Sequence, residues 1–226
     1  MHIEPGVVEG AKLAISYASA AGVIGYAAKL SLDTIKQEGL SALVARSAIT
    51  TVLVFSFFQI FPHAPVGVSE VHLILGATLY LMFGAGPAAI GLAMGLLAQG
   101  VFFAQADLPQ YGMNVTTLLA PLFAAALVAR RVIPKDTAYK DVSYAQAFKL
   151  SAAFQGGVVA WVAFWAVYGQ GFGFENLSQI ATFAAAYAAV IVIEPALDVA
   201  ILAGVKAAGR LKGSPVFHPR LHLAAA

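Results

Sequence analysis

The chain has 226 residues, of which 60% are hydrophobic and 11% are charged, and its formal net charge is +2. A soluble domain carries about twice that charged fraction, and the mean hydropathy here is +0.82, so the composition excludes a soluble globular protein and predicts an all-α integral membrane protein. The sequence contains no cysteine, which excludes disulfides and thiolate metal sites and leaves nitrogen and oxygen as the available metal ligands.

The chain opens with Met1 and His2, and acidic residues follow at Glu4 and Glu9. A cleavable signal peptide would begin with basic residues. We therefore expect Met1 and its α-amine to be retained.

The apolar residues occur in blocks that we interpret as a bundle of about seven transmembrane segments. In chain order the predicted segments cover residues 7–30, 40–61, 72–84, 87–105, 114–131, 147–168 and 180–211. The segment 72–84 is only about 20 Å long as a helix, against a hydrocarbon core of about 30 Å. We predict that it is short and discontinuous, the form in which membrane helices often line binding sites. Residues 1–211 would form one transmembrane domain and 212–226 a cytoplasmic tail.

The basic residues fall on one side of this topology. Of the 13 Lys and Arg residues, all except Lys12 lie in or near loops on a single side. The positive-inside rule then places the N-terminus outside and the C-terminus in the cytoplasm. His2 and His72 would both lie on the outer side, as would Asn114.

The amino terminus has the donor atoms of a metal chelate. The α-amine of Met1, the backbone nitrogen of His2 and the His2 imidazole can bind one cation in small fused rings. The imidazole of His72 would complete a square-planar set of four nitrogens, the geometry of Ni(II) or Cu(II). We therefore expect the N-terminus to insert toward the core and meet His72. The alternative is that Met-His is a chance start and that His72 is an ordinary interfacial residue.

Several polar residues are candidates for supporting roles. His63 lies in the same outer loop and is either a competing ligand or a plain loop residue. Glu70 is placed to orient His72 or to attract cations. Asn114 could hydrogen-bond a ligating imidazole. Gln99, Gln105 and Gln155 fit interhelical hydrogen bonds better than metal ligation.

The seventh segment contains an acidic residue and a proline, Glu194 and Pro195, which we expect to interrupt the helix. A carboxylate inside the membrane is costly and marks a candidate functional position. Glu194 could pair with Arg46 or Lys12, cap the broken helix, or lie in a cation path, and we favour the structural role.

No catalytic motif is visible in the sequence. It has no P-loop, no GxSxG, no HExxH and no paired carboxylates of the di-iron type. We predict that the protein is not an enzyme and does not itself hydrolyse ATP. We also predict that it is embedded in the lipid bilayer and does not bind nucleic acid.

The motifs resemble those of a known family. The sequence resembles the substrate-binding (S) component of nickel/cobalt energy-coupling factor transporters, the CbiM/NikM type, at three motifs. These are Met1-His2-Ile3, the stretch that His72 opens and that ends in Phe83-Gly84, and Gly112-Met113-Asn114. Glu194 in the last helix also looks like a glutamate of that family. The resemblance covers residues 1 to about 205.

The resemblance implies a site and a set of partners. The substrate would be Ni²⁺ or Co²⁺, bound by the Met1 amine, the His2 backbone and imidazole nitrogens, and the His72 imidazole. The partners would be a transmembrane T component and two ATPase subunits, with a small accessory membrane subunit in some systems. The location would be the cytoplasmic (inner) membrane of a prokaryote.

The chain also departs from the family pattern. Glu4-Pro5-Gly6 replaces the usual continuation after the amino-terminal motif, and His72 lacks its usual polar neighbours. The alternative interpretation is a protein with the same fold that serves as a structural or accessory subunit of another membrane complex, with or without a bound metal.

Overall fold

The computed structural model describes residues 2–135 and 137–207, and within them the chain forms seven α-helices. The helices are α1 (Leu13–Glu38), α2 (Leu40–Gln59), α3 (Gly76–Phe83), α4 (Ala85–Phe102), α5 (Tyr111–Val132), α6 (Tyr144–Gln170) and α7 (Phe174–Ala207). Three short 3₁₀ helices lie at η1 (Gly10–Lys12), η2 (Gln105–Gln110) and η3 (Tyr139–Asp141). The prediction of an all-α bundle is confirmed.

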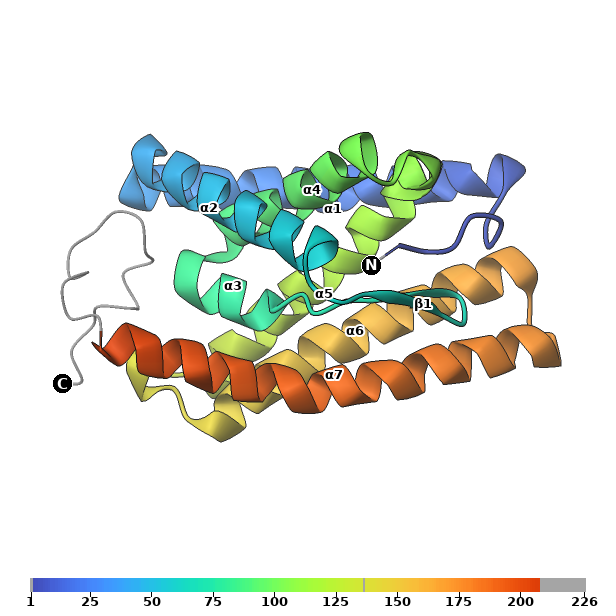
Figure 1. Cartoon of the computed structure of the whole chain (residues 1–226). Coiled ribbons are helices and arrows are strands. Elements are labelled where there is room, and N and C mark those ends of the chain that lie inside the picture. The colour runs from blue at the N-terminus through green and yellow to red at the C-terminus, as the bar shows by residue number, and fades with distance from the viewer. Residues whose placement is uncertain (1, 136, 208–226) are drawn as a thin grey trace.

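Six of these helices can cross a membrane, by length and composition. They run side by side along one direction of the molecule, and the short helix α3 reverses the chain between α2 and α4, so these two helices run in the same direction (Figure 1). An eight-residue helix is only about 12 Å long, so α3 cannot cross a bilayer alone. The expected short, discontinuous segment is present, but its helix begins at Gly76 and not at His72.

Two helices, α1 and α7, continue through positions where the sequence analysis predicted a break. Residues 31–39, which lie between the first two predicted segments, are helical as far as Glu38, because nothing breaks the helix before Gly39, which has a φ of +91°. The expected interruption at Glu194-Pro195 is wrong, since α7 is continuous through both residues. Proline removes one backbone donor, and the remaining hydrogen bonds of a long membrane helix can tolerate that loss. Residues 208–211 of the predicted segment and the predicted tail lie outside the described residues.

A β-hairpin forms in the loop between α2 and α3, where the sequence analysis predicted no regular structure. Strands β1 (Ala64–Val66) and β2 (Ser69–Val71) pair antiparallel around a two-residue turn. Gly67 takes a φ of +63° in this turn, as the first position of a tight hairpin turn requires. A side chain at Gly67 would collide with the backbone carbonyl of Gln179. The tip of the hairpin is therefore packed against α7.

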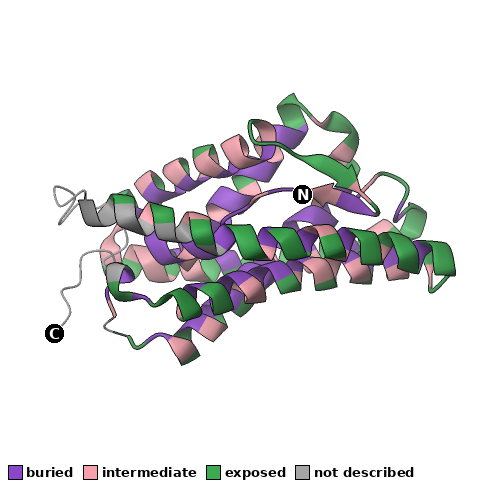
Figure 2. Ribbon diagram, turned by 60° about the horizontal axis from the view of Figure 1, so that its bottom comes forward, coloured by how far each residue is buried: buried purple, intermediate pink, exposed green. Residues whose placement is uncertain are grey.

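Small residues bring helices α2 and α4 into close contact. A Cβ at Gly91 would meet Thr50, and one at Gly95 would meet Val54. The Thr50 hydroxyl donates to the carbonyl of Pro87 at 2.8 Å. Figure 2 shows the resulting pattern, in which buried residues line the inward faces of the helices and exposed ones face outward.

Candidate metal centre

The amino-terminal residues pair with the hairpin. Ile3 forms an antiparallel bridge with Ser69, and the backbone N–H of Glu70 donates to the His2 carbonyl at 3.0 Å. The Ser69 hydroxyl donates to the same carbonyl at 2.8 Å. The chain start thus adds to strand β2 and lies inside the bundle, where His2 is 3% exposed and Ile3 is fully buried.

Asn114 fixes this strand from the other side. It lies in the first turn of α5, and its side-chain oxygen accepts the backbone N–H of Ile3 at 2.9 Å. We expected Asn114 to hydrogen-bond an imidazole. It instead holds the backbone next to His2, so its effect on the imidazole is indirect.

The pairing brings His2 beside His72. The two rings lie 5.8 Å apart between centroids, and each is almost fully buried. Glu70 completes the group: one ligand atom from each of these three residues lies within 4.8 Å of the others. Met1, the other expected ligand, lies outside the described residues.

Glu70 binds His72 directly. Their Nε2 and Oε2 atoms are 2.9 Å apart. Burial lowers the pKa of His72 to about 3. Burial alone would raise the pKa of Glu70, but the hydrogen bond from His72 lowers it to about 2. At neutral pH a neutral His72 therefore donates its Nε2–H to the Glu70 carboxylate. Its Nδ1, which is buried and makes no hydrogen bond to any described group, keeps a free lone pair.

Two residues that we did not assign to the site contact the His2 ring. Nε2 of His2 lies 2.6 Å from Oε1 of Gln99. Nδ1 lies 3.1 Å from a carboxylate oxygen of Asp107, but this contact lacks hydrogen-bond geometry. The sequence held only weak signals of these two contacts. Gln99 is a polar residue in an apolar helix, and Asp107 is the acidic residue of the loop between α4 and α5.

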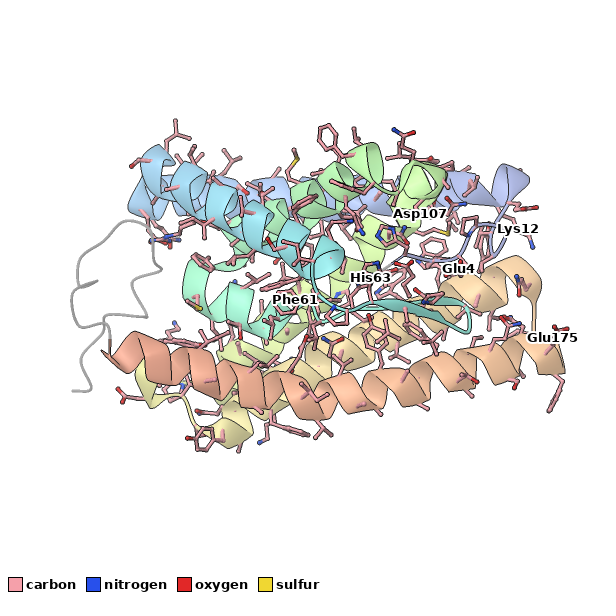
Figure 3. The ribbon with its side chains drawn as sticks, in the orientation of Figure 1. Glu4, Lys12, Phe61, His63, Asp107 and Glu175 are labelled. Carbon is pink, nitrogen blue, oxygen red and sulfur yellow. The ribbon has the colours of Figure 1, made fainter. Side chains whose placement is uncertain are left out.

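Acidic side chains lie near His2. Burial raises the pKa of Glu4, and the negative charges of Glu70 and Asp107 raise it further. Figure 3 shows Glu4 and Asp107 near the amino-terminal strand, with His63 below the end of α2. A cation bound at His2 and His72 would be stabilised by these carboxylates.

His63 lies at the outer edge of the group. Its ring is exposed and stacks on His72 with centroids 5.0 Å apart and an interplanar angle of 14°. Its Nδ1 lies 3.1 Å from the Phe61 carbonyl. His63 thus covers His72 and is not one of the three residues whose ligand atoms converge.

Glu194 supports the segment that carries His72. Its carboxylate accepts the backbone N–H groups of Ile74 at 3.1 Å and Leu75 at 2.8 Å, and the Ser151 hydroxyl at 3.2 Å. Leu75 has a φ of +54°, the left-handed region that non-glycine residues rarely adopt. Glu194 therefore caps the start of α3, not a broken α7.

The two cationic partners considered for Glu194 are engaged elsewhere. Arg46 pairs with Glu38 at 2.6 Å, and Lys12 donates to the Gly169 carbonyl at 2.9 Å.

Comparison with known proteins identifies the family. No curated protein sequence matches the chain significantly. Two crystal structures share the fold: a truncated transition metal transporter, with a TM-score of 0.65, 19% identity and coverage of 90% of this chain and 99% of that one; and a transition metal transporter, with a TM-score of 0.65, 18% identity and coverage of 94% and 100%. The family model for the cobalt uptake substrate-specific transmembrane region, CbiM, matches residues 2–210. The chain therefore belongs to the CbiM family, and it is a membrane component of metal uptake rather than an enzyme.

Proposed function

We propose that this protein is the substrate-binding component of an energy-coupling factor transporter that takes up Ni²⁺ or Co²⁺. The cation would be bound by the α-amine of Met1, the backbone nitrogen and imidazole of His2, and the imidazole of His72. The N-terminus would face the outside of a prokaryotic inner membrane, where the substrate is collected.

The observation that carries this proposal is the convergence of His2 and His72. These residues are far apart in the sequence, yet their rings lie 5.8 Å apart in a buried position beside the amino terminus. Burying two imidazoles and a carboxylate together is unfavourable unless they pair or bind a cation. Four nitrogen donors favour a square-planar ion, and nickel and cobalt both accept imidazole nitrogen.

The proposed partners are those that the family resemblance implies. Uptake against a gradient needs an energy source, so a transmembrane T component and two ATPase subunits would drive it. A tagged chain purified from its native membrane in mild detergent should bring these subunits with it. Recovery of a different membrane assembly would instead favour the accessory-subunit alternative.

The sharpest test of the site alters the first residue. Adding one residue before Met1 converts the α-amine into an amide, whose nitrogen binds metal only after it loses a proton. We expect Ni(II) affinity, measured by isothermal titration calorimetry, to fall by orders of magnitude while the protein still inserts and folds. A tag after Ala226 is the control and should leave binding intact. Equal affinity in the two forms would exclude the amine as a ligand.

A further inference from the structure

Both nitrogens of the His2 ring have a neighbour, but only one of them makes a hydrogen bond. Nε2 is 2.6 Å from the Gln99 side-chain oxygen. Nδ1 is 3.1 Å from Asp107 without hydrogen-bond geometry, and no other described group bonds it. A neutral imidazole carries its proton on one nitrogen, and the hydrogen bond made by that nitrogen selects which.

The orientation of the Gln99 amide is fixed from its other end. Its NH₂ group donates to the Phe58 carbonyl at 3.3 Å. A flipped amide would place its oxygen against that carbonyl and its NH₂ group against His2. The oxygen of Gln99 therefore faces His2, and the His2 nitrogen in contact with it must be the donor.

The sequence explains why the Phe58 carbonyl is free to accept. Phe58 lies in the last turn of α2, which ends at Gln59. The residue four positions later, which would donate to this carbonyl in a continuing helix, is Pro62, and proline has no N–H. Gln99, which is 3% exposed in α4, supplies the missing donor.

We propose that Gln99 positions the His2 imidazole for metal binding: its oxygen holds the ring proton on Nε2 and leaves Nδ1 as the ligand atom. Nδ1 is the nitrogen that closes a six-membered ring between a metal and the backbone nitrogen of the same residue, whereas Nε2 is too distant to do so. Gln99 thus acts on His2 as Glu70 acts on His72. This inference rests on the proposed function.

Two substitutions at position 99 separate this role from packing. Gln99→Met preserves the shape of the side chain and removes the acceptor, and Gln99→Glu preserves an acceptor and changes the charge. We expect Gln99→Met to lower Ni(II) affinity by about 10- to 100-fold, as loss of a partner that orients a ligand does, and to shift the d–d absorption of bound Ni(II). Gln99→Glu should lose less affinity and shift the absorption less than Gln99→Met, because its carboxylate still accepts the His2 N–H although it cannot donate to the Phe58 carbonyl. Gln105→Met, at an exposed glutamine, is the matched control.

A packing role would reverse this order, with Met tolerated and Glu harmful, and that result would overturn the proposal. It would also be overturned if both variants bound like wild type, or if both lost binding equally.

The tautomer of His2 can be measured in the metal-free protein. Nitrogen-15 NMR of histidine-labelled, metal-free protein, at a mildly alkaline pH where an ordinary imidazole is neutral, should show His2 protonated on Nε2, with the signal assigned by its loss in His2→Gln. Gln99→Met should shift the population toward the other tautomer. Protonation on Nδ1 in wild type, or no change in Gln99→Met, would refute the role of Gln99. If wild type binds no Ni(II), the proposed function fails, and this measurement still decides the inference.

Discussion

At the scale of single residues, the three histidines near the amino terminus have different surroundings. His2 and His72 are almost fully buried, whereas His63 is exposed and stacks on the outer face of His72. Burial lowers the pKa of His72 to about 3, so this imidazole offers a lone pair at neutral pH without releasing a proton. Exposure leaves His63 free to exchange its contacts with water.

These differences predict an order of effects on metal binding. His2→Ala and His72→Ala should each lower Ni(II) or Co(II) affinity by more than about 100-fold, because a lost ligand should cost more than the 10- to 100-fold typical of a lost supporting contact. His63→Ala should have a small effect. The loss of affinity in Asn114→Ala should be intermediate, because this change removes the acceptor of the Ile3 backbone N–H. Titration calorimetry of the four variants measures the order. A damaging His63→Ala with a silent His72→Ala would show that the ligands are assigned wrongly.

At the scale of elements, the short helix α3 depends on a contact from α7. The segment before α3 places Leu75 in a left-handed conformation, and the Glu194 carboxylate accepts the backbone N–H groups of Ile74 and Leu75. Both groups are at the start of a helix, where no backbone acceptor is available within the helix itself. The same segment begins with His72, so the position of the imidazole depends on this cap.

Removing the cap should weaken both stability and binding. Glu194→Ala leaves two buried N–H groups without an acceptor, at about 1–3 kcal/mol each. We expect the midpoint of thermal unfolding in detergent to fall by about 4–8 °C for a loss of about 2 kcal/mol, and metal affinity to fall with it. Glu194→Gln keeps one side-chain oxygen and should be milder. The control is Glu175→Ala, at an exposed position of the same helix. Equal midpoints for Glu194→Ala and Glu175→Ala would show that the cap does not stabilise the fold.

At the scale of the whole molecule, the helix connections gather at two ends. The turn between α1 and α2, the junction of α3 with α4, and the segment between α5 and α6 lie at one end (Figure 1). The hairpin, η2 and the turn between α6 and α7 lie toward the other. The Lys and Arg residues that the structure describes, except Lys12, lie at the first end or in the half of a helix nearer to it, so the positive-inside rule predicts that this end is cytoplasmic.

Cysteine labelling tests this orientation. The sequence contains no native cysteine, so single cysteines report without background. Gly173→Cys, where a side chain meets no other atom, should react with a membrane-impermeant reagent added from outside to intact cells. Lys135→Cys, exposed at the opposite end, should react only after the membrane is permeabilised. The reverse pattern would invert the topology and place His2 on the cytoplasmic side.

The sequence by itself determined the helical membrane fold, most segment boundaries and the two histidines of the candidate site. Hydrophobic length and donor chemistry are local properties, and they can be read from Met1, His2 and His72 without knowing their neighbours. The predicted helix break at Glu194-Pro195 was wrong. Proline is a local signal for a break, whereas a long, packed membrane helix tolerates the lost hydrogen bond.

Only the tertiary structure decided which residues support those histidines. Gln99 contacts His2 across 97 positions, Asn114 contacts Ile3 across 111, and Glu194 contacts Leu75 across 119. Each contact depends on how the helices pack and on the amino terminus adding to strand β2. A glutamine or glutamate within an apolar segment predicts that its side chain needs a hydrogen-bond partner if it is buried. The identity of that partner depends on how the helices pack around it.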